Sequence, residues 1–235
     1  MKKSDVTAET KARIPDTTVR RLSLYLRFVQ EAHGRGQETI SSAELARRGG
    51  TTSAQVRKDF SFFGSFGKRG LGYAVPELLR ELEEILGLHR RWRVALVGAG
   101  KIGSALFSYG NFQRRGFDIV ADFDADPSKV GEPWGDIRVQ HDVEMERVLQ
   151  EEAIEIAVLA VPVEAAQRVA DRVTASGVRA ILNFAPVRLR VDESIALRNV
   201  DMVAEMEGLT FSLTADDKET RDRAVRRRDD DSQDA

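Results

Sequence analysis

The sequence contains no cysteine. This absence excludes disulfide bonds, thiolate zinc sites and a thiol nucleophile. Long apolar runs are also missing, because the longest, Ile156–Val163, has eight residues and is too short to span a bilayer. The amino terminus turns polar at once, without the apolar stretch of a secretory signal. We therefore expect a cytoplasmic protein that does not contact a membrane.

Charge is distributed unevenly along the 235 residues, although the net charge is only −2. Residues 1–75 contain 14 Lys and Arg against 7 Asp and Glu, whereas residues 76–235 contain 22 and 31. A basic segment on an acidic body is typical of a protein whose first part binds a polyanion. Chance clustering explains these counts equally well, so composition leaves both interpretations open.

The first third of the chain is predicted to be mostly helical. Residues 1–15 are polar and are expected to form a flexible arm, and a helix then starts with Asp16 or Thr17 as its N-cap. A second helix begins with a capping box of Ser41 and Glu44, and after a Gly-Gly turn residues 53–60 form a third.

A glycine-rich stretch over residues 62–73 is interpreted as a hairpin with Lys68 and Arg69 at its tip. Two short helices followed by a basic hairpin predict a winged helix-turn-helix domain over residues 16–90. In such a domain the second helix of the pair enters the major groove, where Gln55 is suited to adenine and Arg57 to guanine. The predicted DNA contacts are polar, basic or small residues of this helix and the hairpin: Ser53, Gln55, Arg57, Lys58, Lys68, Arg69 and Gly70. The alternative is a small helical dimerisation domain with solvated charges.

From about residue 91 the pattern changes to alternating strands and helices. Strands are expected at residues 92–97, 117–123, 137–140, 154–161 and 178–184, with a sixth at 200–204. This alternation predicts an α/β domain with a doubly wound parallel sheet over residues 91–204. A helix is expected at residues 205–214, and a disordered charged tail over residues 215–235.

A glycine motif lies between the first strand of this sheet and its helix. Gly98 permits a tight turn, Gly100 lets the backbone approach a pyrophosphate, and Gly103 lets helix and strand pack closely. Asp122 and Asp124 lie 19 and 21 residues beyond Gly103, where a Rossmann domain carries the acid that binds a ribose 2′-hydroxyl and favours NAD(H). The predicted nucleotide-binding residues of the motif are Gly98, Ala99, Gly100, Lys101, Ile102 and Gly103. The alternative is a glycine turn that only connects strand to helix.

Catalytic groups are scarce beside this predicted pocket. No substrate domain follows the sheet, His33 and His89 lie outside the nucleotide domain, and His141 is expected at the surface. The sequence therefore predicts neither a catalytic residue nor a metal site, and a pocket without chemistry suits sensing.

Three stretches in this order carry a family resemblance: Val56–Asp59 with Phe63–Gly64 and Gly67–Tyr73, then Gly98–Gly103, then Ile181–Pro186. With them, residues from about 15 to 213 resemble the bacterial redox-sensing repressors of the Rex family. The resemblance implies a homodimer that binds palindromic operator DNA and releases it when NADH binds, whereas NAD+ permits DNA binding.

The resemblance also implies roles for single residues. Arg27, Tyr109 and Asp201 match positions that link the two domains near the nicotinamide, and Asp124 matches the ribose-binding acid better than Asp122 does. The helix over residues 205–214 would be swapped onto the partner chain. Met202 departs from the family, because an aromatic residue that packs on the nicotinamide is expected there.

Two other functions remain open at this point. One is a small NAD-dependent oxidoreductase whose basic first part is an oligomerisation arm. The other is a winged-helix regulator that senses a different nucleotide-like ligand, such as a coenzyme A derivative.

Overall fold

The computed structural model describes residues 14–64, 67 and 71–214. It divides into two compact units, Met1–Arg91 (the first unit) and Trp92–Ala235 (the second unit). The predicted tail, nearly all of the predicted arm, and the three wing residues Lys68, Arg69 and Gly70 lie outside the described residues.

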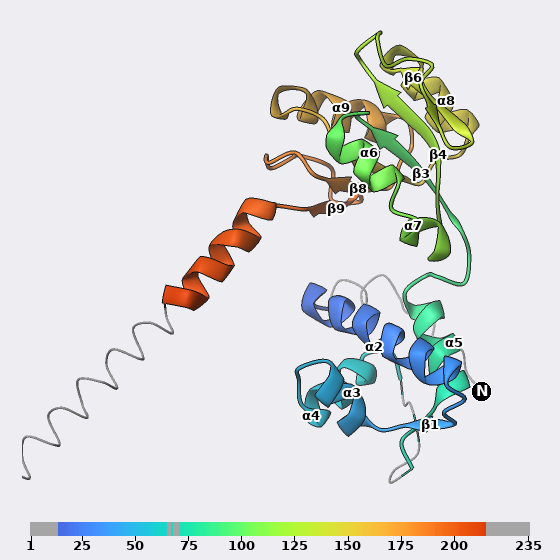
Figure 1. Cartoon of the computed structure of the whole chain (residues 1–235), viewed down its shortest axis with the longest axis vertical. Helices are drawn as coiled ribbons and strands as arrows, with labels where there is room; N and C mark the ends of the chain where they lie inside the picture. The colour runs from blue at the N-terminus through green and yellow to red at the C-terminus, as the bar shows by residue number, and fades with distance from the viewer. Residues whose placement is uncertain (1–13, 65–66, 68–70, 215–235) are drawn as a thin grey trace, which may run out of the picture. The chain divides into compact units, whose positions relative to one another are not determined.

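The first unit consists of helices with a short two-stranded sheet beside them (Figure 1). Its elements are α2 (Asp16–Gly34), β1 (Thr39–Ile40), α3 (Ser42–Arg48), α4 (Ser53–Ser61), β2 (Tyr73–Ala74) and α5 (Val75–Ile85). The side chain of Ser41 caps α3 as predicted, accepting the Glu44 N–H at 3.0 Å. Neither Asp16 nor Thr17 is the N-cap of α2, because the helix already includes Asp16 and the residue before it is Pro15. Proline fixes its own φ and so sets the start of the helix without a side-chain cap.

The glycine-rich stretch meets the sheet differently from the predicted hairpin. Tyr73 pairs with Ile40, and Ala74 with Thr39, in an antiparallel ladder. The described strand after the glycines therefore pairs with a segment that precedes α3, while the predicted tip lies outside the described residues.

The core of the first unit comes from the apolar stripe of α2, since Leu22, Leu26 and Val29 are fully buried. Tyr25 and Tyr73 hold the ring of Phe60 between them in edge-to-face contacts, with centroid distances of 5.7 and 5.1 Å. These contacts fix α4, which carries Phe60, against α2 and β2.

The second unit is built on one seven-stranded sheet with the order β5-β6-β4-β3-β7-β8-β9. The strands are β3 (Trp92–Val97), β4 (Phe117–Asp124), β5 (Pro133–Trp134), β6 (Ile137–His141), β7 (Ile156–Leu159), β8 (Ala180–Asn183) and β9 (Ala196–Asn199). All neighbouring strands run parallel except the edge pair β5–β6. The predicted doubly wound sheet is therefore confirmed, with a short antiparallel strand added at one edge.

Helices cover both faces of the sheet (Figure 1). They are α6 (Lys101–Phe107), α7 (Asn111–Arg114), α8 (Met145–Glu151) and α9 (Val163–Ala175), with the 3-10 turn η1 (Asp142–Glu144) before α8. Ala121 and Phe123 of β4 pack with α8 and α9, whereas Leu96 of β3 faces Leu106 and Phe107 on the other side. This alternation follows from the two-residue period of a strand.

The expected strand over residues 200–204 is wrong. The sixth strand of the parallel set, β9, comes earlier, and residues 202–214 are helical. The reason is Asp201, whose Oδ1 accepts the backbone N–H groups of Val203 and Ala204 at 3.0 Å each and so starts a helix. The expected C-terminal helix therefore begins three residues before residue 205. In the described part of the chain, no helix is both long and apolar enough to cross a membrane.

Candidate functional site

The loop between β3 and α6 borders a pocket of about 580 Å³. Strand order reverses at this point, since β4 and β6 lie on one side of β3 and β7 to β9 on the other. Ligands of open α/β sheets bind at such a switch point, outside the carboxyl ends of the strands. The lining residues come mainly from the loop, from α6 and from the segment after β4: Ala99, Gly100, Lys101, Ser104, Ala105, Ser108, Lys129, Glu132 and Trp134.

The three glycines of the loop differ in what surrounds them. Gly98 has φ +110°, and a Cβ there would lie 2.4 Å from the carbonyl oxygen of Ala160. A Cβ on Gly103 would lie 2.0 Å from the carbonyl oxygen of Gly98. The fold itself therefore requires glycine at both positions.

At Gly100 a Cβ would meet nothing within 4 Å in the described chain, and its φ of −87° suits any residue. Neither backbone strain nor internal packing requires glycine at this position. The missing side chain instead leaves the backbone open towards the pocket. Gly100 is also the N-cap of α6 and provides no side-chain acceptor for the first N–H groups of that helix.

Asp124 lies beside this loop, at the end of β4. Its Oδ2 accepts the Ala99 N–H at 2.8 Å and the Lys129 ammonium at 2.9 Å, and its Oδ1 accepts the Asp126 N–H at 2.8 Å. The hydrogen bond to Asp124 raises the pKa of Lys129. Asp124 therefore connects the glycine loop to a lysine that also lines the pocket.

Asp122 lies in a different environment. It is fully buried, and neither of its carboxyl oxygens has a hydrogen-bond partner among the described residues. Burial raises the pKa of Asp122 to about 7. Of the two acids singled out in the sequence, the one with a polar environment next to the pocket is therefore Asp124.

The remaining residues singled out near the nucleotide lie at the surface, all but Arg27 in the second unit. Tyr109 follows α6, is half exposed, and its hydroxyl accepts the Asn111 side-chain amide at 2.8 Å. Asp201 caps the helix over residues 202–214, and Met202 is exposed on it. Ile102 is also partly exposed. Arg27 belongs to the first unit, on the exposed side of α2.

The predicted DNA contacts on α4 separate into two groups. Arg57 and Lys58 are exposed, and Arg57 donates to the hydroxyl of Ser42 on α3 at 3.1 Å. Ser53 and Gln55 are half-buried, and the Gln55 amide donates to Asp59 at 2.9 Å. Helix α4 starts where the sequence predicts because the hydroxyl of Thr52 accepts the Gln55 N–H at 3.1 Å.

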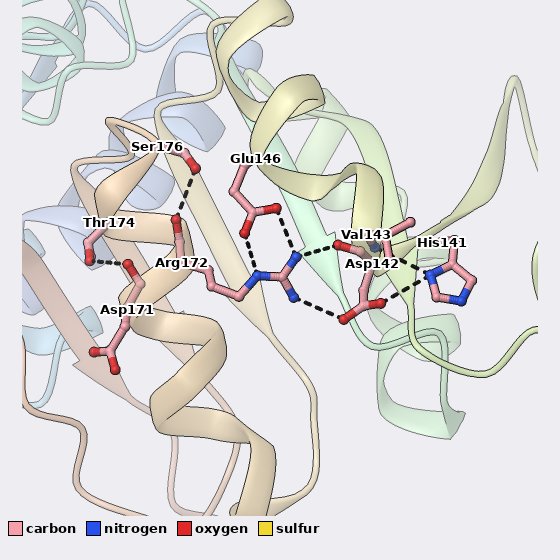
Figure 2. A network of polar contacts seen from close by, with 8 residues as sticks. All are labelled: His141, Asp142, Val143, Glu146, Asp171, Arg172, Thr174 and Ser176. Atoms are coloured by element: carbon pink, nitrogen blue, oxygen red, sulfur yellow. Dashed lines mark hydrogen bonds and ion pairs between the residues drawn. The ribbon is translucent and has the colours of Figure 1, made fainter.

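A polar network on the other face of the second unit was not predicted (Figure 2). Arg172 of α9 donates to both carboxylate oxygens of Glu146, at 2.5 and 2.8 Å, and to Asp142 at 2.9 Å. Asp142 lies 3.1 Å from Nδ1 of His141, which is partly exposed and pairs in register with Asp124. These bonds raise the pKa of Arg172 and fasten α9 to α8. Arg172 thereby holds the end of β6, two strands from the glycine loop.

Lys129 is one of the pocket residues that were not predicted from the sequence. The signal for it was a lysine five residues after the acid of the motif. Trp134 was missed because β5, which carries it, has only two residues.

Both halves of the chain match known protein families. A family model described as "Putative DNA-binding protein N-terminus" matches residues 13–61, and one described as "CoA binding domain" matches residues 89–187. The redox-sensing transcriptional repressor Rex of Chloroflexus aurantiacus is 46% identical over 199 residues, covering 85% of this chain and 94% of its own. Rex of Streptomyces coelicolor is 47% identical over 198 residues, covering 84% and 77%.

The chain belongs to the Rex family. Solved Rex structures agree with the fold: RSP, a Rex-family repressor, is 32% identical with a TM-score of 0.81, covering 88% of this chain and 97% of its own. RSP in complex with NAD+ and operator DNA is 33% identical with a TM-score of 0.83, covering 88% of this chain and 96% of its own. Because the Rex relatives are named transcriptional repressors, the chain is a regulator, and the oxidoreductase alternative is wrong. The winged-helix and Rossmann architecture expected from the sequence is the Rex architecture.

Proposed function

We propose that this Rex protein is a homodimer that represses transcription by binding operator DNA and releases the DNA when NADH enters the pocket of the second unit. The observation that carries the proposal is that RSP, similar along its whole length, has been solved both with NADH and with NAD+ and operator DNA. The protein then works in the cytoplasm, where operator DNA is found.

The pocket and the carboxylate beside it offer groups for two parts of a dinucleotide, the pyrophosphate and the ribose. Gly100 leaves room for a pyrophosphate to approach the backbone, and Lys101 and Lys129 supply positive charge. Asp124 keeps acceptor capacity for a ribose hydroxyl beside the loop. An apolar nicotinamide site favours NADH over NAD+, because reduced nicotinamide is neutral and oxidised nicotinamide is cationic.

The DNA-binding surface is assigned to residues 16–90, with α4 as the helix in the major groove. Arg57 and Lys58 are exposed on it, as DNA contact requires. Lys68, Arg69 and Gly70 complete this surface in the proposal, as the wing that reaches the minor groove or the phosphates.

Coupling between the nucleotide and the DNA is assigned to Arg27, Tyr109 and Asp201, and the helix over residues 205–214 to exchange between the two chains. Six apolar side chains of the 202–214 helix are each at least 60% exposed in the single chain: Met202, Val203, Met206, Leu209, Phe211 and Leu213. An exposed apolar surface of this kind marks an interaction site, and in the proposal it packs against a second copy of the chain. DNA and NADH then weaken each other reciprocally, with a tenfold effect corresponding to about 1.4 kcal/mol.

The test is binding to a labelled palindromic promoter fragment at fixed salt, with NADH and NAD+ titrated separately. NADH should release the DNA at concentrations where NAD+ does not. If the protein binds DNA and neither nucleotide changes that binding, the regulatory ligand is not NADH. If the protein binds NADH but no DNA, the proposal is overturned.

Gly100→Ala provides the sharpest control for the pocket. The new methyl group enters open space, so the variant should fold and bind operator normally, yet NADH should no longer release it. Gly103→Ala is the matched opposite, because its Cβ would collide with the backbone of Gly98 and should prevent folding of the second unit. Arg27→Ala should bind operator with unchanged affinity and require more NADH for release.

A further inference from the structure

A buried carboxylate lies between α4 and α2. Asp59 has no exposed surface, and it accepts hydrogen bonds from Thr18, Arg21 and Tyr25 of α2. The Arg21 guanidinium makes a two-pronged contact, with Nε 2.6 Å from Oδ2 and Nη2 2.7 Å from Oδ1. The Tyr25 hydroxyl lies 3.0 Å from Oδ2, and Gln55, one turn earlier on α4, donates its amide to Oδ1 at 2.9 Å.

The surroundings of Asp59 keep it ionised. Burial alone would raise the pKa of Asp59, but hydrogen bonds from Arg21, Gln55 and Tyr25 outweigh burial and lower it. The same contacts raise the pKa of Arg21. A buried charge of this kind is tolerated only while its donors stay in place, so the pair restricts how α4 can turn on α2.

The side chain of Gln55 belongs to this hydrogen-bonded cluster. Reading adenine needs the glutamine amide to present its oxygen and an N–H to the base. Here one of its two N–H groups is bonded to Asp59, which orients the amide toward that buried carboxylate. Its neighbours Arg57 and Lys58 are exposed, so the helix presents them outward while it turns Gln55 inward.

We propose that Asp59, Arg21 and Gln55 set the orientation of α4, and that Gln55 is a positioning residue instead of a reader of bases. The inference rests on the proposed function, in which α4 enters the major groove. It changes the role that the sequence suggested for Gln55.

The test compares Gln55→Ala with wild type on the operator and on operators changed at one base pair at a time, at fixed salt. A positioning residue should lower the affinity by a similar factor, about threefold to tenfold, on every operator, so that the base preferences stay the same. A base reader should lose affinity for the wild-type operator alone, and discrimination at one base pair should collapse by about tenfold or more. That second pattern would overturn the inference, and so would wild-type affinity on every operator.

Further variants separate positioning from loss of folding. Gln55→Met keeps the volume of the stem and lacks the amide, so it should reproduce the uniform loss even where the alanine variant is unstable. Arg21→Lys keeps the charge without the two-pronged contact and should also lower the affinity uniformly. Gln37→Ala is the matched control, because it removes a glutamine that donates to Glu44 and does not contact Asp59.

The outcomes also separate this inference from the proposed function. If wild-type protein binds no operator, the proposed function fails. If wild type binds and only Gln55→Ala loses base discrimination, the function stands and the inference fails.

Discussion

Two fully buried carboxyl groups, one in each unit, have opposite environments. Asp59 accepts hydrogen bonds from four side chains, whereas Asp122 has no partner among the described residues. Asp122 lies in the sheet between Leu96 and Val139, where the ladder already uses the backbone N–H groups. The pKa of Asp59 is therefore lowered and that of Asp122 raised to about 7. Burial alone thus does not decide the charge of a carboxyl group, because the available donors do.

The two groups should give the two units opposite pH dependence. Asp59 stabilises the first unit at pH values above its ordinary pKa of 3.8, and this stability is lost as acid protonates it. Asp122 loses its proton near pH 3.8 in the unfolded chain and near pH 7 in the folded chain. The second unit should therefore lose stability as the pH rises from about 4 to about 7 and stay constant above that range.

The largest effect is expected from Asp59→Ala, which leaves Arg21 without its buried partner. We expect the first unit to lose about 3–5 kcal/mol of unfolding free energy. Urea denaturation followed by circular dichroism measures the loss. Tryptophan fluorescence serves as the internal control, because both tryptophans, Trp92 and Trp134, belong to the second unit. A fluorescence transition that moves as far as the dichroism would contradict a local effect.

Asp122→Asn should act in the other direction. The amide has nearly the same shape and cannot ionise, so the variant should gain up to about 4 kcal/mol over wild type at about pH 8 and little at about pH 4. Tryptophan fluorescence during urea denaturation at both pH values tests this. Asp126→Asn, at an exposed aspartate nearby, is the matched control. Equal stability of the wild-type second unit at the two pH values would refute the comparison.

A smaller effect is expected from Tyr25→Phe, which removes one donor to Asp59 and keeps the ring against Phe60. The first unit should lose about 1 kcal/mol. The midpoint of urea denaturation by circular dichroism measures it. A loss as large as that of Asp59→Ala would mean that the ring packing, not the hydrogen bond, had been disturbed.

The smallest effect on stability is expected at Asp124, a carboxylate that is partly exposed and paired. Lys129→Met should cost less than about 1 kcal/mol, because the ion pair reaches solvent. Its effect on nucleotide binding should be clearer. Without Lys129, the carboxylate of Asp124 repels a 2′-phosphate more strongly, so the affinity for NADPH should fall relative to the affinity for NADH. Titration of both nucleotides measures the ratio, and an unchanged ratio would exclude Lys129 from nucleotide selection.

Much of the fold could be predicted because it depends on local patterns. The periods of the strands, the glycine motif and the capping box at Ser41 are all encoded within a few residues. The strand expected at residues 200–204 failed because apolar residues around Asp201 resemble a strand until the side chain of Asp201 is seen to cap a helix. Strand β5 was missed because two residues show no period.

The surroundings of single polar residues could not be predicted in the same way. Asp59 obtains three of its four donors from α2, 34 to 41 residues earlier in the sequence, so the residues near it do not indicate burial with charge. Gln55 donates to Asp59 from one turn earlier on the same helix, and it is the burial of Asp59 against α2 that turns Gln55 away from the role that its residue type suggests. Asp124 could be chosen over Asp122 only through the family resemblance, since the spacing alone fits both.

The exposed apolar side chains of the 202–214 helix make the proposed repressor depend on the cellular concentration of the protein. In the proposed homodimer the 202–214 helix of each chain is buried against the partner chain. Dilution separates the chains and exposes the six apolar side chains of each helix to water. A single chain also brings one α4 to a palindromic operator in place of two. Operator occupancy should therefore fall more steeply than in proportion to protein level, and a promoter controlled by this protein should respond to gene dosage as well as to NADH.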